Sequence, residues 1–142
     1  MLVIKFLKHG LLIGCLIFTP NLVAQVLITH AQNTTIELSK NKLRAIFAMR
    51  TAHWADGSPI HVFVLEDDNT LHATFCKDIL GMYPYQLRRI WDRQVFSGTG
   101  VAPITVKTEQ EMVERVSQTH GAIGYIHSEI LTSSVKTIGK VL

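Results

Sequence analysis

Cysteine is scarce in this chain of 142 residues, and its two thiols lie in different parts of the sequence. Cys15 falls in an apolar N-terminal segment that we expect to be removed, which leaves Cys76 alone. A lone cysteine excludes an intramolecular disulfide, so the domain must be held together by its hydrophobic core. We expect Cys76 to be a small buried residue rather than a metal ligand or a nucleophile.

Net charge is also small. The chain has 14 Lys and Arg against 11 Asp and Glu, but Lys5 and Lys8 lie in the same N-terminal segment. The remainder therefore carries 12 basic side chains against 11 acidic ones. Such a balance offers no strongly basic surface to DNA or RNA, so we expect no nucleic-acid partner.

Recognisable catalytic and metal-binding motifs are missing. Six histidines follow the N-terminal segment, and none of them forms the helical pair of a zinc site such as HExxH. The sequence also lacks the G-x-S-x-G turn of serine hydrolases. We therefore predict that the protein is not an enzyme, with no catalytic residue, no cofactor and no bound metal.

The longest apolar segment has the layout of a secretory signal peptide. The two N-terminal lysines precede an apolar stretch from Leu11 to Phe18, and the small residue Ala24 follows. The stretch is well short of the roughly 20 residues that a membrane-spanning helix needs. We predict a signal peptide over residues 1–24, cleavage after Ala24, and a periplasmic domain over residues 25–142 that has no membrane span.

A lipoprotein signal is the alternative for this segment. Leu12-Ile13-Gly14-Cys15 resembles a lipobox, in which Cys15 would carry the lipid. The apolar run continues past the cysteine, however, whereas in a lipoprotein it precedes the cysteine. Cleavage after Ala24 is therefore the favoured interpretation.

Strand-like and helix-like segments alternate along the rest of the chain, which predicts an α/β domain. Strands are expected over residues 26–30, 60–66, 104–106, 122–127 and 135–142. Helices are expected over residues 40–49, 70–80, 84–96 and 109–119, with N-caps at Ser39, at Asp68 or Asn69, and at Thr108. The strand over 60–66 is rich in β-branched and aromatic residues, so we place it centrally in the sheet.

Two polar loops are candidates for an anion site. Ser97-Gly98-Thr99 has the hydroxyls of a phosphate cradle, but it follows a helix and leads to Pro103, so a C-terminal turn is favoured. Glu66-Asp67-Asp68-Asn69-Thr70 joins a strand to a helix, and its three carboxylates suit the helix dipole but repel phosphate. The candidate ligand-binding residues in these loops are Asn69, Thr70, Ser97 and Thr99.

The sequence also suggests roles for its two tryptophans and for three neighbouring arginines. Trp54 and Trp91 are expected to anchor the core or a turn. Arg88, Arg89 and Arg93 are expected to form a basic stripe on one helix, either as a solvated face or as a surface for a partner.

Several segments, in this order, resemble the PstS-like phosphate-binding proteins of ABC transporters, and in particular their short single-domain relatives. They are LSKNKLRAIFAMRTAHWADGSPIHVFV, TFCKDILGM, IWDRQVFSGTGVAP and GAIGYI, and the resemblance covers nearly all of the chain from about residue 26 to the end. The more specific matches are Leu43-x-x-Ile46-Phe47, Trp54-x-x-Gly57, Phe75 and Gly121–Tyr125. The resemblance implies an exported protein with one lobe of the type 2 periplasmic-binding-protein fold: a mixed sheet of about four or five strands with about four helices.

The phosphate site of that family is not carried over. With Phe75 set on the family's helix phenylalanine, Leu65 stands where the family has an arginine. Asn69-Thr70-Leu71 then stands where the family has Ser-Gly-Thr. The cationic ligand is therefore missing, and acidic residues surround the gap.

Two functions follow as hypotheses. The first is a solute-binding domain for phosphate or another small anion, which feeds or informs an envelope transporter and has its pocket completed by a second copy. The second is a binding-protein lobe that has lost its ligand and docks onto an envelope transporter or sensor protein. The acidic cluster Glu66-Asp67-Asp68 favours the second.

Overall fold

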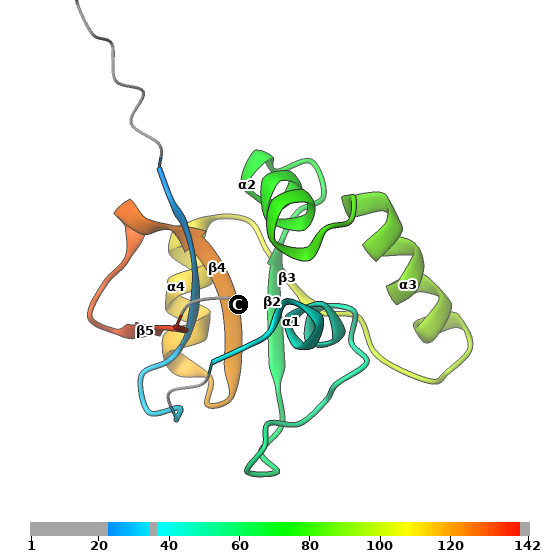
Figure 1. Ribbon diagram of the computed structural model, residues 1–142, viewed down its shortest axis with the longest axis horizontal. Coiled ribbons are helices and arrows are strands. Elements are labelled where there is room, and N and C mark those ends of the chain that lie inside the picture. Colours follow the sequence, from blue (N-terminus) through cyan, green and yellow to red (C-terminus); the bar gives the residue numbers. More distant parts are fainter. Residues whose placement is uncertain (1–22, 35–36, 140–142) are drawn as a thin grey trace, which may run out of the picture.

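The computed structural model describes residues 23–34 and 37–139, and within them a five-stranded sheet has the order β3-β2-β4-β1-β5 (Figure 1). β1 runs antiparallel to β4 and to β5, whereas β2 runs parallel to β3 and to β4. The strands are β1 (Gln25–His30), β2 (His61–Leu65), β3 (Ile104–Val106), β4 (Ala122–His127) and β5 (Val135–Thr137).

Helices cover this sheet and extend from one side of it. They are α1 (Lys40–Phe47), α2 (Thr70–Thr74), α3 (Pro84–Phe96) and α4 (Glu109–Gln118), with a π-helical segment η1 (Phe75–Leu80) directly after α2 and a 3-10 turn η2 (Ser128–Ile130). α4 packs on β4 and β1, whereas α3 lies at the right of Figure 1, away from those strands. The predicted α/β class, with its mixed sheet and four α-helices, is confirmed over the described residues.

The predicted boundaries need small corrections. β1 begins one residue earlier than expected, and β2 is one residue shorter at each end. β5 covers only part of the expected 135–142 strand, of which residues 140–142 lie outside the described ranges. β2 has neighbours on both sides, as its composition predicts.

Short polar side chains cap the N-termini of α1, α2 and α4, as the sequence indicates. The hydroxyl of Ser39 accepts from the N–H of Lys42, and that of Thr108 accepts from the N–H of Glu111. The segment Thr108–Glu111 also has the sequence of a capping box, which is only half formed: the carboxylate of Glu111 accepts from the N–H of Lys107 instead of that of Thr108. The N-cap of α4 is therefore correct and its reciprocal bond is displaced by one residue.

The two tryptophans are core anchors. Trp91 is fully buried, and its indole N–H donates to the carbonyl of Phe47 at 2.8 Å. Gln94, three residues later, donates to the carbonyl of Ala48. These bonds satisfy carbonyls that the end of α1 leaves free, so they fix α3 against α1. Trp54 donates in the same way to the carbonyl of Gly121 at 2.9 Å.

Gly121 is required at the turn between α4 and β4. Its φ of 76° lies in the left-handed region, and a Cβ added there would overlap the carbonyl oxygen of Pro59. The turn brings the start of β4 against the loop that precedes β2. This contact sets the relative position of the two central parallel strands.

The parallel strands β2, β3 and β4 end at the same edge of the sheet, at the top of Figure 1. α2 follows β2 at this edge, and α4 follows β3. Open α/β sheets bind ligands outside the carboxyl ends of their strands, so this edge is the place to examine for a site. Among residues 23–34 and 37–139, no helix is long and apolar enough to cross a membrane.

Candidate functional site

A buried hydroxyl connects three elements at the carboxyl edge. Tyr125 of β4 accepts a hydrogen bond from the N–H of Leu65, the last residue of β2, at 2.9 Å. Its hydroxyl lies 2.5 Å from Nδ1 of His72 in α2. Burial raises the pKa of Tyr125 above its ordinary value, so the hydroxyl keeps its proton and donates it to Nδ1. The proton of the His72 ring is then on Nε2.

His72 is fully buried and is held in its neutral form. Burial lowers the pKa of the imidazole, and this effect outweighs the opposing attraction of the Asp67 carboxylate. Nε2 lies 3.8 Å from Oδ1 of Asp67 and 3.5 Å from the sulfur of Cys76. The ring thus connects the buried hydroxyl to the partly exposed acidic loop.

Cys76 and His72 do not form a nucleophilic pair. Burial raises the pKa of the thiol to about 12, so the thiolate is not formed near neutral pH. A cysteine–histidine–aspartate relay also needs the thiol and the carboxylate on opposite ring nitrogens, whereas here both lie toward Nε2. Cys76 is a buried packing residue, as the sequence predicts. The contact with His72 was not predicted, although the spacing of four residues on one helical segment is its sequence signal.

The acidic loop contains one strong ion pair. Asp67 accepts two hydrogen bonds from the Arg88 guanidinium, at 2.9 and 2.8 Å, in a bidentate arrangement. The pair lowers the pKa of Asp67 and raises that of Arg88. The guanidinium also lies 4.9 Å from the centre of the Trp91 ring. The three arginines therefore do not form one stripe, because Arg88 turns to the loop while Arg89 and Arg93 are exposed.

The N-terminus of α2 is capped by its own side chain. Oδ1 of Asn69 accepts from the N–H groups of Leu71 and His72, at 2.9 and 3.4 Å. An anion bound at this helix end would need the same N–H groups as donors. The helix α2 is also short, with five residues. Thr70 is exposed beside the cap, whereas Leu65 and Leu71 are buried.

Ser97 and Thr99 lie in a C-terminal turn of α3, the interpretation that the sequence favours. The N–H groups of residues 97–100 all donate to carbonyls of α3, and Gly98 has the left-handed φ of 69°. The hydroxyls of Ser97 and Thr99 bond to each other at 2.8 Å. In Figure 1 this turn lies at the lower right and α2 at the top, so the four predicted ligand-binding residues fall into two separate pairs.

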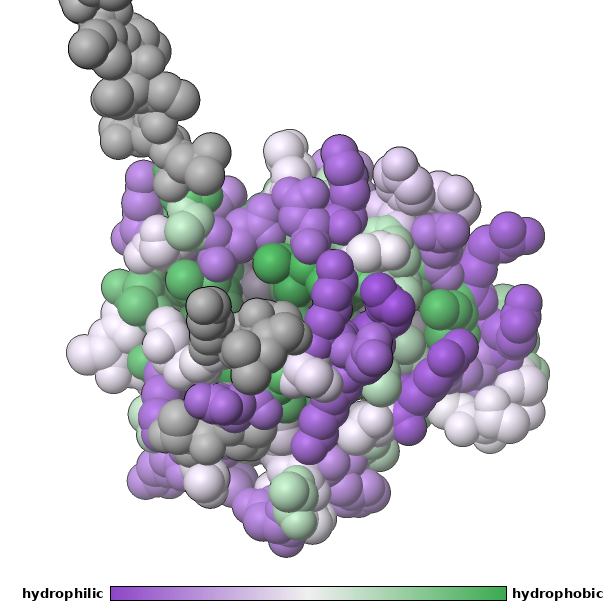
Figure 2. Space-filling model, viewed as in Figure 1, coloured by the Kyte–Doolittle hydropathy of each residue, from purple (hydrophilic) through white to green (hydrophobic). Residues whose placement is uncertain are grey.

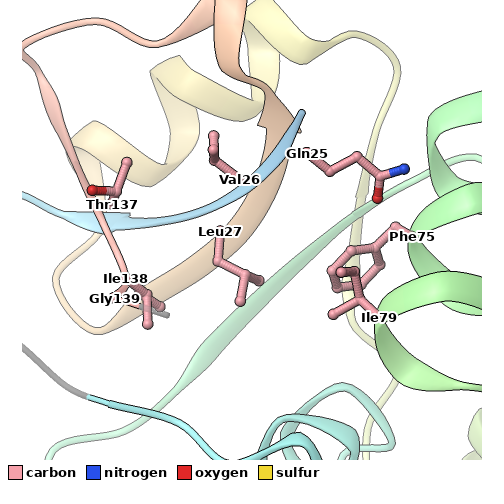
Figure 3. Close-up of a pocket in the computed structure, with 8 residues that line it drawn as sticks. All are labelled: Gln25, Val26, Leu27, Phe75, Ile79, Thr137, Ile138 and Gly139. Carbon is pink, nitrogen blue, oxygen red and sulfur yellow. The ribbon is translucent and has the colours of Figure 1, made fainter. Parts of the chain in front are cut away.

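Two of the cavities in the described part of the chain are lined by none of these four residues. One of about 400 Å³ lies between β1, η1 and β5, where Leu27, Phe75 and Ile79 point toward one another (Figure 3). Gln25 extends over its rim, and the amide oxygen of this side chain is buried without a partner among the described residues. The other, of about 350 Å³, lies against Trp54 and has a polar lining that includes Asp56, Ser58 and His120.

Comparison with known proteins finds this architecture in solved structures. No protein-family model and no curated protein matches the chain. Solved structures do: an ABC-type phosphate transport receptor from Vibrio cholerae matches with a TM-score of 0.64 at 16% identity. A putative phosphate ABC transporter substrate-binding protein with bound phosphate, from Clostridium perfringens, gives 0.67 at 22%, and PstS from Borrelia burgdorferi gives 0.60 at 18%.

The chain has the fold of about half of a PstS protein. Each match covers 82% of this chain but only 44–46% of the other, which is consistent with a single lobe. The resemblance that the sequence predicts is thereby confirmed at the level of the fold. The neighbours are described as a transport receptor and as binding proteins, not as enzymes.

The buried histidine generates a prediction about pH. The pKa of His72 is lower in the folded protein than in the unfolded chain, where a histidine has a pKa of about 6.5. Below that pH the unfolded chain therefore binds more protons than the folded protein, so acid destabilises the fold. We expect the free energy of unfolding to fall from about pH 7 to pH 5, by up to about 1.4 kcal/mol per pH unit. Asp67 does not contribute in this window, since its lowered pKa keeps it ionised.

Urea unfolding of the wild type and of His72→Gln at several pH values measures this effect. The variant is expected to show a shallower dependence on pH, because its side chain does not titrate. His53→Gln is the matched control, since His53 is exposed, and it should retain the wild-type slope. Equal slopes for the wild type and His72→Gln would contradict the assignment.

Proposed function

We propose that this chain is an exported, non-catalytic PstS-like lobe that acts through contacts with envelope proteins and does not itself bind phosphate. One observation carries the proposal: the groups that could hold an anion at the carboxyl edge are already bonded within the protein. The side-chain oxygen of Asn69 accepts hydrogen bonds from the N–H groups at the start of α2. The carboxylate of Asp67 accepts both hydrogen bonds from the Arg88 guanidinium.

Electrostatics at this edge support the same conclusion. Asp67 balances Arg88, but the neighbouring carboxylates of Glu66 and Asp68 form no ion pair with any other described residue and are exposed. Like charges repel one another, so these carboxylates disfavour a phosphate dianion at this edge, most strongly at low ionic strength. An anion would also have to displace the side chain of Asn69 from the helix that it caps.

Phosphate or anion binding for transport or sensing is the second candidate function. Arg88 favours this second function, because its guanidinium places a cation at the carboxyl edge, where the buried apolar side chain of Leu65 provides no charge. The fold match to a Clostridium perfringens protein with bound phosphate adds to it. In this case the Arg88 guanidinium would release the Asp67 carboxylate and bind the anion instead, and hydroxyls such as that of Thr70 would lie nearby.

Export is the cellular part of the proposal. A signal peptide over residues 1–24 would leave a periplasmic domain over residues 25–142, and residues 1–22 lie outside the described ranges. β1 begins at Gln25, which supports cleavage after Ala24 because the whole strand would stay in the mature chain. A lipoprotein attached through Cys15 is the alternative.

Phosphate titration separates the two functions. We expect calorimetry at low ionic strength and neutral pH to show no saturable binding of phosphate to the wild type, because Arg88 and the α2 cap are occupied. Under the second function the wild type binds, Asp67→Asn binds more tightly by freeing Arg88, and Arg88→Gln does not bind. Arg93→Gln is the matched control, since Arg93 is exposed on the same helix.

N-terminal sequencing of the protein from a periplasmic extract tests export. The expected mature protein begins at Gln25. A protein that begins at a lipid-modified Cys15 would establish the lipoprotein alternative, and an intact N-terminus in the cytoplasm would contradict export altogether.

A further inference from the structure

The outer face of α3 carries four exposed side chains in one line. Tyr85, Arg89, Asp92 and Phe96 have the spacing i, i+4, i+7 and i+11, which places them on a single face of a helix. Tyr85 is 60% exposed and Phe96 is 89% exposed, and both charged residues between them are exposed as well. Tyr85 is partly covered by the ring of Tyr83, on which it stacks, whereas Phe96 is almost entirely in water. Exposed aromatic side chains at both ends of a stripe are typical of an interaction surface.

The opposite face of the same helix is fixed to the domain. Leu87 and Trp91 are buried, and the side chains of Trp91 and Gln94 bond to the end of α1. α3 therefore presents its outer stripe from a rigid support, at the right of Figure 1. Figure 2 shows mainly hydrophilic side chains over this part of the molecule, interrupted by a hydrophobic group.

The order of the four side chains is self-complementary. Read in either direction the stripe is an aromatic ring, two opposite charges and an aromatic ring. An antiparallel copy of α3 would therefore set Tyr85 against Phe96 of the second copy, and Arg89 against Asp92 of the second copy. Neither Arg89 nor Asp92 forms an ion pair with another described residue, so both charges are available.

We propose that two copies of this chain associate through α3, with the helices antiparallel about a two-fold axis that crosses the outer stripe midway between Arg89 and Asp92. A two-fold contact uses the same surface on both subunits, which this stripe satisfies residue by residue. The aromatic pairs supply apolar contact at both ends, and the two ion pairs fix the direction and register of the helices. This inference goes beyond the proposed function, because it names a partner and the surface that binds it.

The contact involves one helix of 13 residues from each copy, which is about 20 Å long. It is smaller than a standard stable interface, so the dimer is weak and reversible. Sedimentation velocity of the purified protein over about a hundredfold range of concentration is the appropriate measurement, because the dimer fraction must rise with concentration.

Charge reversal tests the pairing directly. Arg89→Asp sets two carboxylates opposite each other in the dimer, and Asp92→Arg sets two guanidinium groups opposite each other. Each variant alone should therefore dissociate to monomer at concentrations where the wild type is a dimer. An equimolar mixture of the two should dimerise again, because every reversed charge then faces its opposite. Phe96→Ser should weaken the wild-type dimer by at least about tenfold, the loss of a buried aromatic contact.

Lys42→Asp is the matched control, because it reverses an exposed charge on α1 and should leave the dimer unchanged. Far-UV circular dichroism of each variant establishes that the helices are retained. A wild type that stays monomeric over the whole concentration range overturns the proposal. A dimer that persists in both single variants, or a mixture that stays monomeric, overturns it equally.

Discussion

The hydrogen bonds of the buried Tyr125 hydroxyl are the constraint on which the carboxyl edge depends. They join β4 to the last residue of β2 and to the first turn of α2, so they fix where the central strand ends and where the helix begins. The tyrosine ring is itself stacked on Phe75 of η1, with centroids 3.9 Å apart and the planes at 7°. With both ends of the loop held, Asn69 is positioned to cap α2, and Asp67 is positioned to meet Arg88.

This arrangement supports the proposal that the lobe shares the fold of phosphate-binding proteins but does not itself hold phosphate. A helix N-terminus attracts anions only while its N–H groups are free and a cation is available nearby. Here the cap is an amide oxygen of the chain, and the nearby cation holds a carboxylate. The edge that binds ligands in open α/β sheets is therefore used to hold elements of the lobe together. In the proposed account, contacts with other copies of the chain are made by the exposed helix α3, whose inner face is fixed by the same core.

Much of the fold could be predicted from the sequence because the signals are local. Ser39, Asn69 and Thr108 mark helix starts through the next turn of backbone, and the alternation of strand-like and helix-like segments gives the α/β class. The turn at Gly98 is also local, and so could be told from a phosphate loop.

The organisation of the candidate site could not be predicted in the same way. Asp67 and Arg88 are 21 positions apart, and His72 and Tyr125 are 53 positions apart, so only the folded sheet brings them together. The sequence showed the acidic loop and the missing arginine at Leu65. It did not show that Arg88 of α3 places its guanidinium against this loop. It also predicted three arginines on one face, because periodicity does not reveal that Arg88 has a partner elsewhere.

The most direct measurement is the equilibrium unfolding of Tyr125→Phe, which keeps the ring stacked on Phe75 and removes only the hydroxyl. The N–H of Leu65 and Nδ1 of His72 would both be left buried without this partner, at a cost of about 1–3 kcal/mol for each group. We therefore predict a loss of about 2–6 kcal/mol in the free energy of unfolding, with no loss for Tyr85→Phe at the surface. A Tyr125→Phe protein as stable as the wild type would contradict the account, because the carboxyl edge would then not depend on this hydroxyl.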